Sequence, residues 1–175
     1  MSWSDIRMPR RRQVLMWPVA LATPLIGSLA GCGFELRRAP TLPFERVALS
    51  GFSARSPLAE ELTRELAASA KVVAAGDRPE VLLQAITDRR DKVVVAATAA
   101  GQVREVQLRM RFEFRLQSAG GRELLAPVNL LLTRDLSYNE TAALAKEYEE
   151  AQIYAALQTE IIMQVLRRLA VAKRA

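Results

Sequence analysis

The residues from Glu105 to Gln117 alternate between polar and apolar side chains, and this alternation constrains the fold more than any other feature of the sequence. A period of two is the period of a β-strand that buries one face and leaves the other in water. The segment therefore predicts a long strand of an antiparallel sheet, with one face against a core. Its apolar positions are Val106, Leu108, Met110, Phe112, Phe114 and Leu116.

Turn signals on both sides of this segment predict neighbouring strands. The stretches 99–102 and 118–121 each contain glycine and are expected to be hairpin turns. A strand from Leu124 to Leu136 should follow the second turn, with Pro127 near its start, where a missing backbone donor is tolerated. Residues 81–96 should precede the first turn, and periodicity alone leaves open whether they form one bent strand or two. Residues 47–49 predict a further short strand, which makes four.

Two amphipathic helices are predicted. Ser56 and Pro57 supply an N-cap and an N1 proline for the first, which has leucines at positions 58, 62 and 66 and should end near Ser69. The second should begin around 137–139, with Ser137 and Glu140 as a capping box or Asn139 as the cap. Its expected core-facing residues are Leu144, Tyr148, Ala151, Ala155, Ile162, Val165 and Leu169.

Each helix must bury its apolar stripe, and the apolar face of the sheet is the large partner available. The predicted fold class is therefore α+β. The expected architecture is a two-layer α/β sandwich, with two helices packed on one face of a mixed, mainly antiparallel four-stranded sheet. Residues 46–175 should form this single domain.

The first 31 residues predict a lipoprotein signal peptide. Four arginines precede 22 uncharged residues, Gln13 to Phe34, and two prolines and three glycines interrupt that stretch, which argues against a spanning helix. Leu29-Ala30-Gly31-Cys32 resembles the bacterial lipobox, in which the cysteine is acylated, with palmitate as one acyl group, before cleavage. Residues 32–45 would then be a lipidated tether. The alternative is an uncleaved anchor helix with a buried cysteine.

The composition excludes several kinds of chemistry. The chain has no histidine and one cysteine, so an imidazole base, a histidine-containing zinc site and an intramolecular disulfide are ruled out. Glu147, Glu149 and Glu150 fall on different faces of the second helix and cannot act together on one bond. We therefore expect no enzymatic activity, no metal and no cofactor. The net charge of +6 falls to +3 without residues 1–31, which argues against nucleic-acid binding.

Short motifs near both ends of the chain resemble a known family. Cys32-Gly33-Phe34-Glu35-Leu36-Arg37 resembles the start of the mature lipopolysaccharide (LPS)-assembly lipoproteins of the LptE family. The run 134–139, followed by Ala143-Leu144-Ala145-Lys146-Glu147, resembles the entry to that family's last helix, and 167–169 its tail. The order of predicted elements also matches, with one strand, a helix, three strands and a long helix.

The resemblance implies a non-enzymatic lipoprotein, lipid-anchored in the outer membrane and facing the periplasm. Gly33, in place of aspartate after Cys32, resembles the sorting signal of outer-membrane cargo. Such a protein would plug the LptD β-barrel as a 1:1 heterodimer, assist its assembly, and bind LPS during delivery to the cell surface. The alternative is an auxiliary lipid-shuttling periplasmic lipoprotein of an ABC-type transport system, which would hold an acyl chain in a deep apolar cavity.

The resemblance also suggests an LPS-binding site. Lys146 matches the lysine of the family's Ala-Leu-Ala-Lys segment and should project outward, about 200° around the helix from Leu144. The competing interpretation is an i,i+4 ion pair with Glu150. Family members can carry a basic residue in the turn before the longest strand, where this chain has none. Arg104 or Arg89 is the expected substitute.

Arg109, Arg111 and Arg115 lie on the polar positions of the alternating strand. Because mixed-sign charge keeps exposed sheets soluble, a solvated face is the first interpretation. The second interpretation is a contact with polar walls inside a water-filled barrel lumen, since arginine binds carboxylates and phosphates with two parallel hydrogen bonds.

Overall fold

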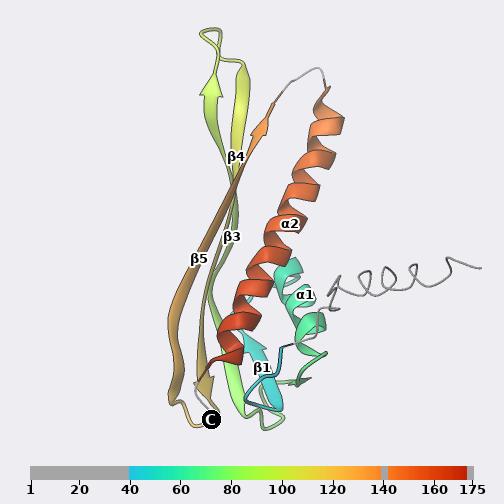
Figure 1. Ribbon diagram of the computed structural model, residues 1–175. Helices are drawn as coiled ribbons and strands as arrows, with labels where there is room; N and C mark the ends of the chain where they lie inside the picture. Colours follow the sequence, from blue (N-terminus) through green and yellow to red (C-terminus); the bar gives the residue numbers. More distant parts are fainter. Residues whose placement is uncertain (1–39, 139–141, 173–175) are drawn as a thin grey trace, which may run out of the picture. The chain divides into compact units, whose positions relative to one another are not determined.

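The computed structural model describes residues 40–138 and 142–172. The predicted signal peptide, Cys32 and the first part of the predicted tether lie outside the described residues, as do Asn139 and Glu140. Along the chain the elements are β1 (Arg46–Ser50), α1 (Pro57–Leu66), β2 (Lys71–Val73), β3 (Val81–Ala97), β4 (Val103–Ser118), β5 (Glu123–Ser137) and α2 (Ala143–Ala170) (Figure 1).

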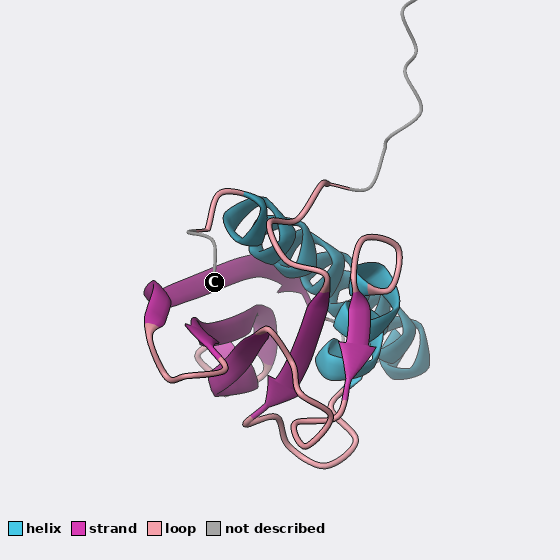
Figure 2. Cartoon of the chain, turned by 90° about the horizontal axis from the view of Figure 1, so that it is seen from below, coloured by secondary structure: helices cyan, strands magenta, loops and turns pink. Residues whose placement is uncertain are grey.

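The strands form one sheet in the order β2-β1-β3-β4-β5. The central pairs β3–β4 and β4–β5 are antiparallel, while β1 is parallel to both β2 and β3. Both helices lie on the same side of this sheet (Figure 2). The α+β class is confirmed, but the prediction of four mainly antiparallel strands is wrong. The fifth strand, β2, has only three residues, which is too short for a periodicity to reveal it.

Residues 81–97 form one strand with a β-bulge near its middle. Ala85 pairs with Phe114 and Thr87 pairs with Glu113, so Ile86 is an extra residue in β3. The bulge reverses which positions of β3 face the helices, because side chains alternate along a strand. We call the face that meets the helices the inner face. Before the bulge its residues are apolar, and after it they are Asp88, Arg90 and Lys92.

The apolar side chains of β4 lie at the centre of the core. Phe112 and Phe114 stack with ring centroids 5.3 Å apart, and Phe52 stacks on Phe112 at 5.7 Å. The three predicted leucines of α1 are fully buried, and Phe44, two residues before the predicted domain start, is also in the core. The buried residues of α2 are Leu157, Gln158, Ile161, Ile162, Val165, Leu166 and Leu169.

The start of α2 and the exposure of its first turns differ from the prediction. Ser137 ends β5 and does not cap the helix, whose N-cap is Ala142 without a side-chain hydrogen bond. Leu144 and Tyr148, expected in the core, are 83% and 70% exposed. The physical reason is that Arg90 and Lys92 occupy the inner face there, and α2 turns polar side chains toward them. Further along, the expected burial of Ile162, Val165 and Leu169 is confirmed, whereas Ala151 and Ala155 are exposed.

Candidate functional site

The end of the domain that holds the β3–β4 turn differs from the packed core. We call it the distal end: residues 92–104 of the hairpin, Tyr138, and the first turns of α2, 143–150. In Figure 1 the hairpin extends beyond both the end of β5 and the start of α2. Beneath it lies a second, smaller apolar cluster of Val106, Leu108 and Leu136. The distal end is therefore anchored to the sheet but is thinly covered.

A polar network separates the distal end from the main core. Arg90 donates a hydrogen bond to Gln158, whose own amide donates to Glu61 and, at 3.2 Å, to the carbonyl oxygen of Pro57. Gln158 is buried, and the network ties β3, α1 and α2 together. Since an unpaired buried amide is costly, these partners fix the rotation of α2.

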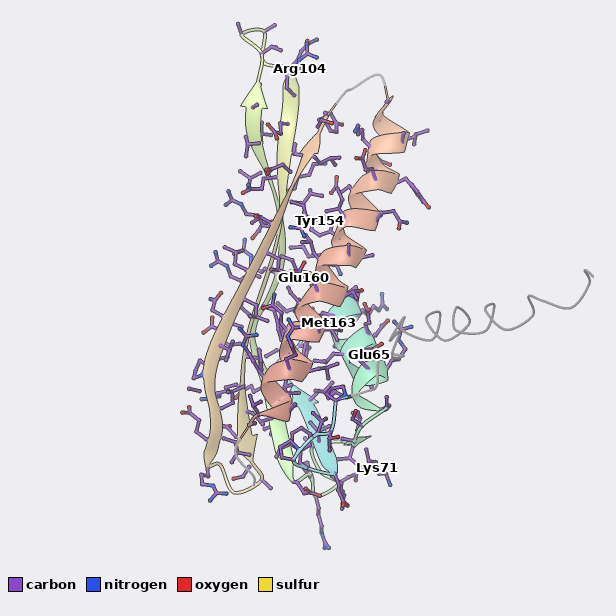
Figure 3. All side chains as sticks on the ribbon, viewed as in Figure 1. Glu65, Lys71, Arg104, Tyr154, Glu160 and Met163 are labelled. Atoms are coloured by element: carbon purple, nitrogen blue, oxygen red, sulfur yellow. The ribbon has the colours of Figure 1, made fainter. Side chains whose placement is uncertain are left out.

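Tyr154 lies beside this network, between α2 and the sheet (Figure 3). Its hydroxyl donates to the carbonyl oxygen of Asp91 at 2.9 Å, and Arg90 stands over its ring at 5.4 Å. Burial raises the pKa of Tyr154, and the nearby Glu150 carboxylate raises it further, because both disfavour a phenolate. Tyr154 is therefore a neutral hydrogen-bond donor and not a proton acceptor.

The distal end carries three cations from three different elements. Lys92 of β3 pairs with Glu150 at 2.6 Å and stands over the ring of Tyr138 at 5.4 Å. Arg104 of β4 is exposed near the base of the hairpin, and its guanidinium forms no ion pair within the described ranges 40–138 and 142–172 (Figure 3). Lys146 of α2 is the third. These side chains offer N–H donors in a region with few buried groups.

The placement of Lys146 corrects the prediction that it projects outward. Leu144 and Tyr148 face solvent, so Lys146, on the opposite side of the helix, has a side chain that is only 18% exposed. It pairs with Glu149 at 2.7 Å, while Glu150, its expected partner, pairs with Lys92. Sequence reasoning missed Lys92, because only the bulge at Ile86 shows that it faces the helix.

The other predicted site residues lie on the outer face of the sheet, away from both helices. Arg89 pairs there with Asp91 at 2.8 Å and is therefore not part of the distal cation set. Arg109 donates to Gln107 at 2.7 Å, and Arg115 donates twice to Gln84, at 2.9 and 2.7 Å.

Arg111 differs from its neighbours on the outer face. It is exposed, it lies directly across from Arg89 on β3, and across from Leu131 on β5. Two like charges in opposed strand positions repel each other, and Leu131 leaves nearly half of its surface in water. Of the three predicted arginines, Arg111 is the one whose guanidinium has no hydrogen-bond partner in the described part of the chain.

Other kinds of site have little support in the described residues. No three metal-ligating side chains of residues 40–138 and 142–172 cluster together. Within the same ranges, neither helix combines the length and apolarity that a membrane crossing requires. A surface depression of about 600 Å³ lies between the end of β1 and α1, and its lining mixes Leu49 and Phe52 with Glu60 and Arg64.

Comparison with known proteins decides the family. The model of the lipopolysaccharide-assembly family LptE matches residues 44–169, which include every strand and nearly all of α2. The chain belongs to the LptE family. It therefore has a role in lipopolysaccharide assembly. No curated protein is significantly similar in sequence.

Solved structures agree with the LptE assignment. An uncharacterized lipoprotein B from Nitrosomonas europaea is 32% identical, with 79% of this chain and 90% of that chain covered and a TM-score of 0.67. The rare lipoprotein B from Shewanella oneidensis (23% identity, 72% and 94% covered, TM-score 0.60) shares the fold. A minor lipoprotein from Acinetobacter baumannii also shares the fold (15% identity, 78% of this chain and 98% of that chain covered, TM-score 0.62).

Proposed function

We propose that the protein is a non-enzymatic lipoprotein, anchored in the outer membrane through Cys32, that pairs 1:1 with the LptD β-barrel and binds lipopolysaccharide. The observation that carries this proposal is the LptE family match over residues 44–169. The lipobox-like sequence before Cys32 supports the anchor. Acyl chains hold a protein at a membrane because each buried methylene contributes about 0.8 kcal/mol.

The cations of the distal end support LPS binding. LPS carries phosphate groups, and arginine and lysine form charge-assisted hydrogen bonds with phosphate oxygens. Arg104 is exposed and free of ion pairs in the described part of the chain, so it can bind a phosphate without losing another partner. Lys92 and Lys146 would exchange their present carboxylate partners for phosphate.

The outer face of the sheet supports contact with a barrel lumen. Arg111 and Leu131 are an exposed cation and an exposed leucine side by side, and neither is covered by the described domain. A polar lumen wall with carboxylates would relieve the repulsion between Arg111 and Arg89. Arg109 and Arg115 already have amide partners and would contribute less.

The rival function, a lipid shuttle, would need a deep apolar cavity. In this fold the space between the sheet and the helices is filled by side chains: Leu62, Leu83, Phe112, Phe114 and Ile161 are all completely buried. A filled core supports a scaffold that works through its surface. Isolation in mild detergent separates the two functions, since a barrel should co-purify with the first and a phospholipid-loaded monomer would indicate the second.

Two variants with one control test the proposal further. Arg104→Gln should weaken LPS binding several-fold in a direct binding assay, and Arg111→Glu should reduce co-purification of LptD. Lys71→Gln is the matched control, because Lys71 is an exposed strand cation at the far edge of the sheet (Figure 3). Unchanged LPS affinity in Arg104→Gln, or unchanged LptD recovery in Arg111→Glu, would remove that residue from the site.

A further inference from the structure

The surface depression between the end of β1 and α1 is separate from the distal end and from the outer face of the sheet. Its volume is about 600 Å³, and it has a strand wall and a helix wall. The strand wall includes Leu49 and Phe52, and the helix wall is formed by Ala59, Glu60, Thr63 and Arg64. None of these residues takes part in the LPS and LptD contacts proposed above, so the depression has no role in that function.

The depression begins where β2 ends. Val73, the last residue of β2, pairs with Ala48, whereas β1 continues to Ser50. On its other side β1 pairs with β3 as far as Ser50. The last two residues of β1 therefore have a strand partner on one side only, and both of them line the depression. An unpaired strand edge is a template for pairing with another chain.

The open edge of β1 presents a backbone acceptor. The carbonyl oxygen of Glu45 points toward β2, where it accepts a hydrogen bond from the N–H of Lys71 at 2.8 Å. The next carbonyl, that of Arg46, points the other way and accepts from the N–H of Glu80 at 3.0 Å. Because this direction alternates along a strand, the carbonyl of Leu49 points to the same side as that of Glu45. It lies beyond the last residue of β2 and can accept a hydrogen bond from an added strand.

The helix wall supplies two opposite charges. Glu60 and Arg64 are exposed, and neither forms an ion pair with another residue of 40–138 or 142–172. They lie four residues apart on α1, which corresponds to a rise of about 6 Å. Alternate side chains of an extended strand are about 6.6–6.8 Å apart on one face. An extended segment can therefore place one acidic and one basic side chain, two positions apart, opposite Arg64 and Glu60.

These features fit an extended peptide better than a lipid. A peptide added as a strand donates a backbone N–H to the Leu49 carbonyl, and the aliphatic stems of its side chains cover Leu49 and Phe52. An acyl chain offers no donor to that carbonyl. An anionic headgroup at Arg64 would also lie close to the carboxylate of Glu60, which repels it.

We propose that the depression between β1 and α1 binds an extended segment of a partner protein as an added strand beside Leu49 and Ser50. The side chains of this segment that face α1 are one acidic residue, which pairs with Arg64, and one basic residue, which pairs with Glu60. The inference does not depend on LPS binding or on the LptD contact, because it concerns a different surface of the domain.

A synthetic peptide tests the strand pairing. The probe is fluorescein-labelled Thr-Val-Glu-Val-Lys-Val-Thr, in which glutamate and lysine lie on one face of the extended chain and the valines on the other. Fluorescence anisotropy with the mature protein in mild detergent should show saturable binding below about 1 mM. The same peptide with its three central nitrogens methylated keeps every side chain but cannot donate from those residues. It should bind at least tenfold more weakly.

Two protein variants test the location. Ala59→Met fills the depression with a good helix former and should weaken peptide binding at least fivefold. Its matched control is Ala68→Met, at an exposed alanine just beyond α1. Arg64→Glu should weaken binding severalfold, whereas Arg167→Glu, at an exposed arginine of α2, should not. Thermal unfolding of each variant confirms that it folds.

Each alternative has a distinct result. If the peptide does not bind below about 1 mM, or if the methylated peptide binds equally well, strand addition is overturned. If neither Ala59→Met nor Arg64→Glu changes the affinity, the peptide binds elsewhere and this site is overturned. A dimer in sedimentation that Ala59→Met dissociates would assign the depression to a second copy of the chain and would also overturn the proposal. None of these results bears on LPS binding or on co-purification with LptD.

Discussion

The hydroxyl of Ser56 joins α1 to the sheet, and its removal gives a prediction of definite size. The hydroxyl accepts a hydrogen bond from the backbone N–H of Ala59 at 3.1 Å and donates one to Asp88 at 2.6 Å. Ser56 is buried, so when its hydroxyl is removed, water cannot fully replace the hydrogen bonds that it makes with Ala59 and Asp88. Loss of an N-cap costs about 1 kcal/mol. Loss of a hydrogen bond to a charged group costs about 1.5–3 kcal/mol.

Ser56→Ala should therefore lower the free energy of unfolding by about 2–3 kcal/mol, since the partly buried Asp88 regains some water. Urea denaturation followed by circular dichroism measures this change. Ser53→Ala, at an exposed serine in the same loop, is the control and should change stability by less than about 0.5 kcal/mol.

A double-mutant cycle with Asp88→Ala separates the two roles of the hydroxyl. If Ser56 and Asp88 interact as described, the double variant should be more stable than the sum of the single effects predicts, by about 1–2 kcal/mol. Additive effects, within about 0.5 kcal/mol, would mean that Ser56 acts only as a helix cap. A Ser56→Ala variant as stable as the native protein would refute the reasoning altogether.

Three further predictions concern separate parts of the chain. Gly51→Ala should lower the melting temperature strongly, because a Cβ there would lie 2.1 Å from the carbonyl oxygen of Ala85 at a φ of +79°, whereas Gly76→Ala, with open space around it, should not. Because burial raises the pKa of Tyr154, its contribution to stability is complete below its ordinary pKa of about 10 and is lost as pH rises through the folded value. Urea denaturation at pH values across that range should show that the free energy of unfolding falls less steeply with pH in Tyr154→Phe than in the unsubstituted protein. Cys32→Ala should abolish acylation and cleavage. Intact mass measurement of the membrane-extracted protein should therefore find the unmodified mass of residues 1–175 in the variant and not in the unsubstituted protein.

The strands were predictable wherever a single pattern ran without interruption. The alternation of 105–117 predicted β4, whose bounds are Val103–Ser118, because one face is buried and the other is wet along its whole length. The turn residues before and after it were equally clear, and Gly101 and Gly121 both have positive φ. The pattern of β3 is broken because Ile86 bulges, and no local signal distinguishes a bulge from a strand end.

The exposure of the first turns of α2 was not predictable because it depends on elements that are distant in sequence. Leu144 and Tyr148 lie on the same stripe of α2 as Gln158 and Ile162, yet Leu144 and Tyr148 are exposed whereas Gln158 and Ile162 are buried. The side-chain partners of Gln158 come from β3 and α1. Hydropathy alone gives a buried glutamine no advantage over an exposed leucine, so only the assembled fold shows which part of the stripe is covered.

The uneven covering of α2 underlies the contrast between the two ends of the domain. The half of α2 from Leu157 to Leu169 packs on the main core, and this burial supplies the stability of the helix. The half from Ala143 to Tyr154 buries little, so its position depends on a few polar contacts such as the pair of Lys92 and Glu150. Contacts of that kind contribute little free energy in water and can be exchanged for a ligand at small cost. The fold therefore places its exchangeable cations and its uncovered hairpin at the one end where a ligand can displace existing contacts without disturbing the core.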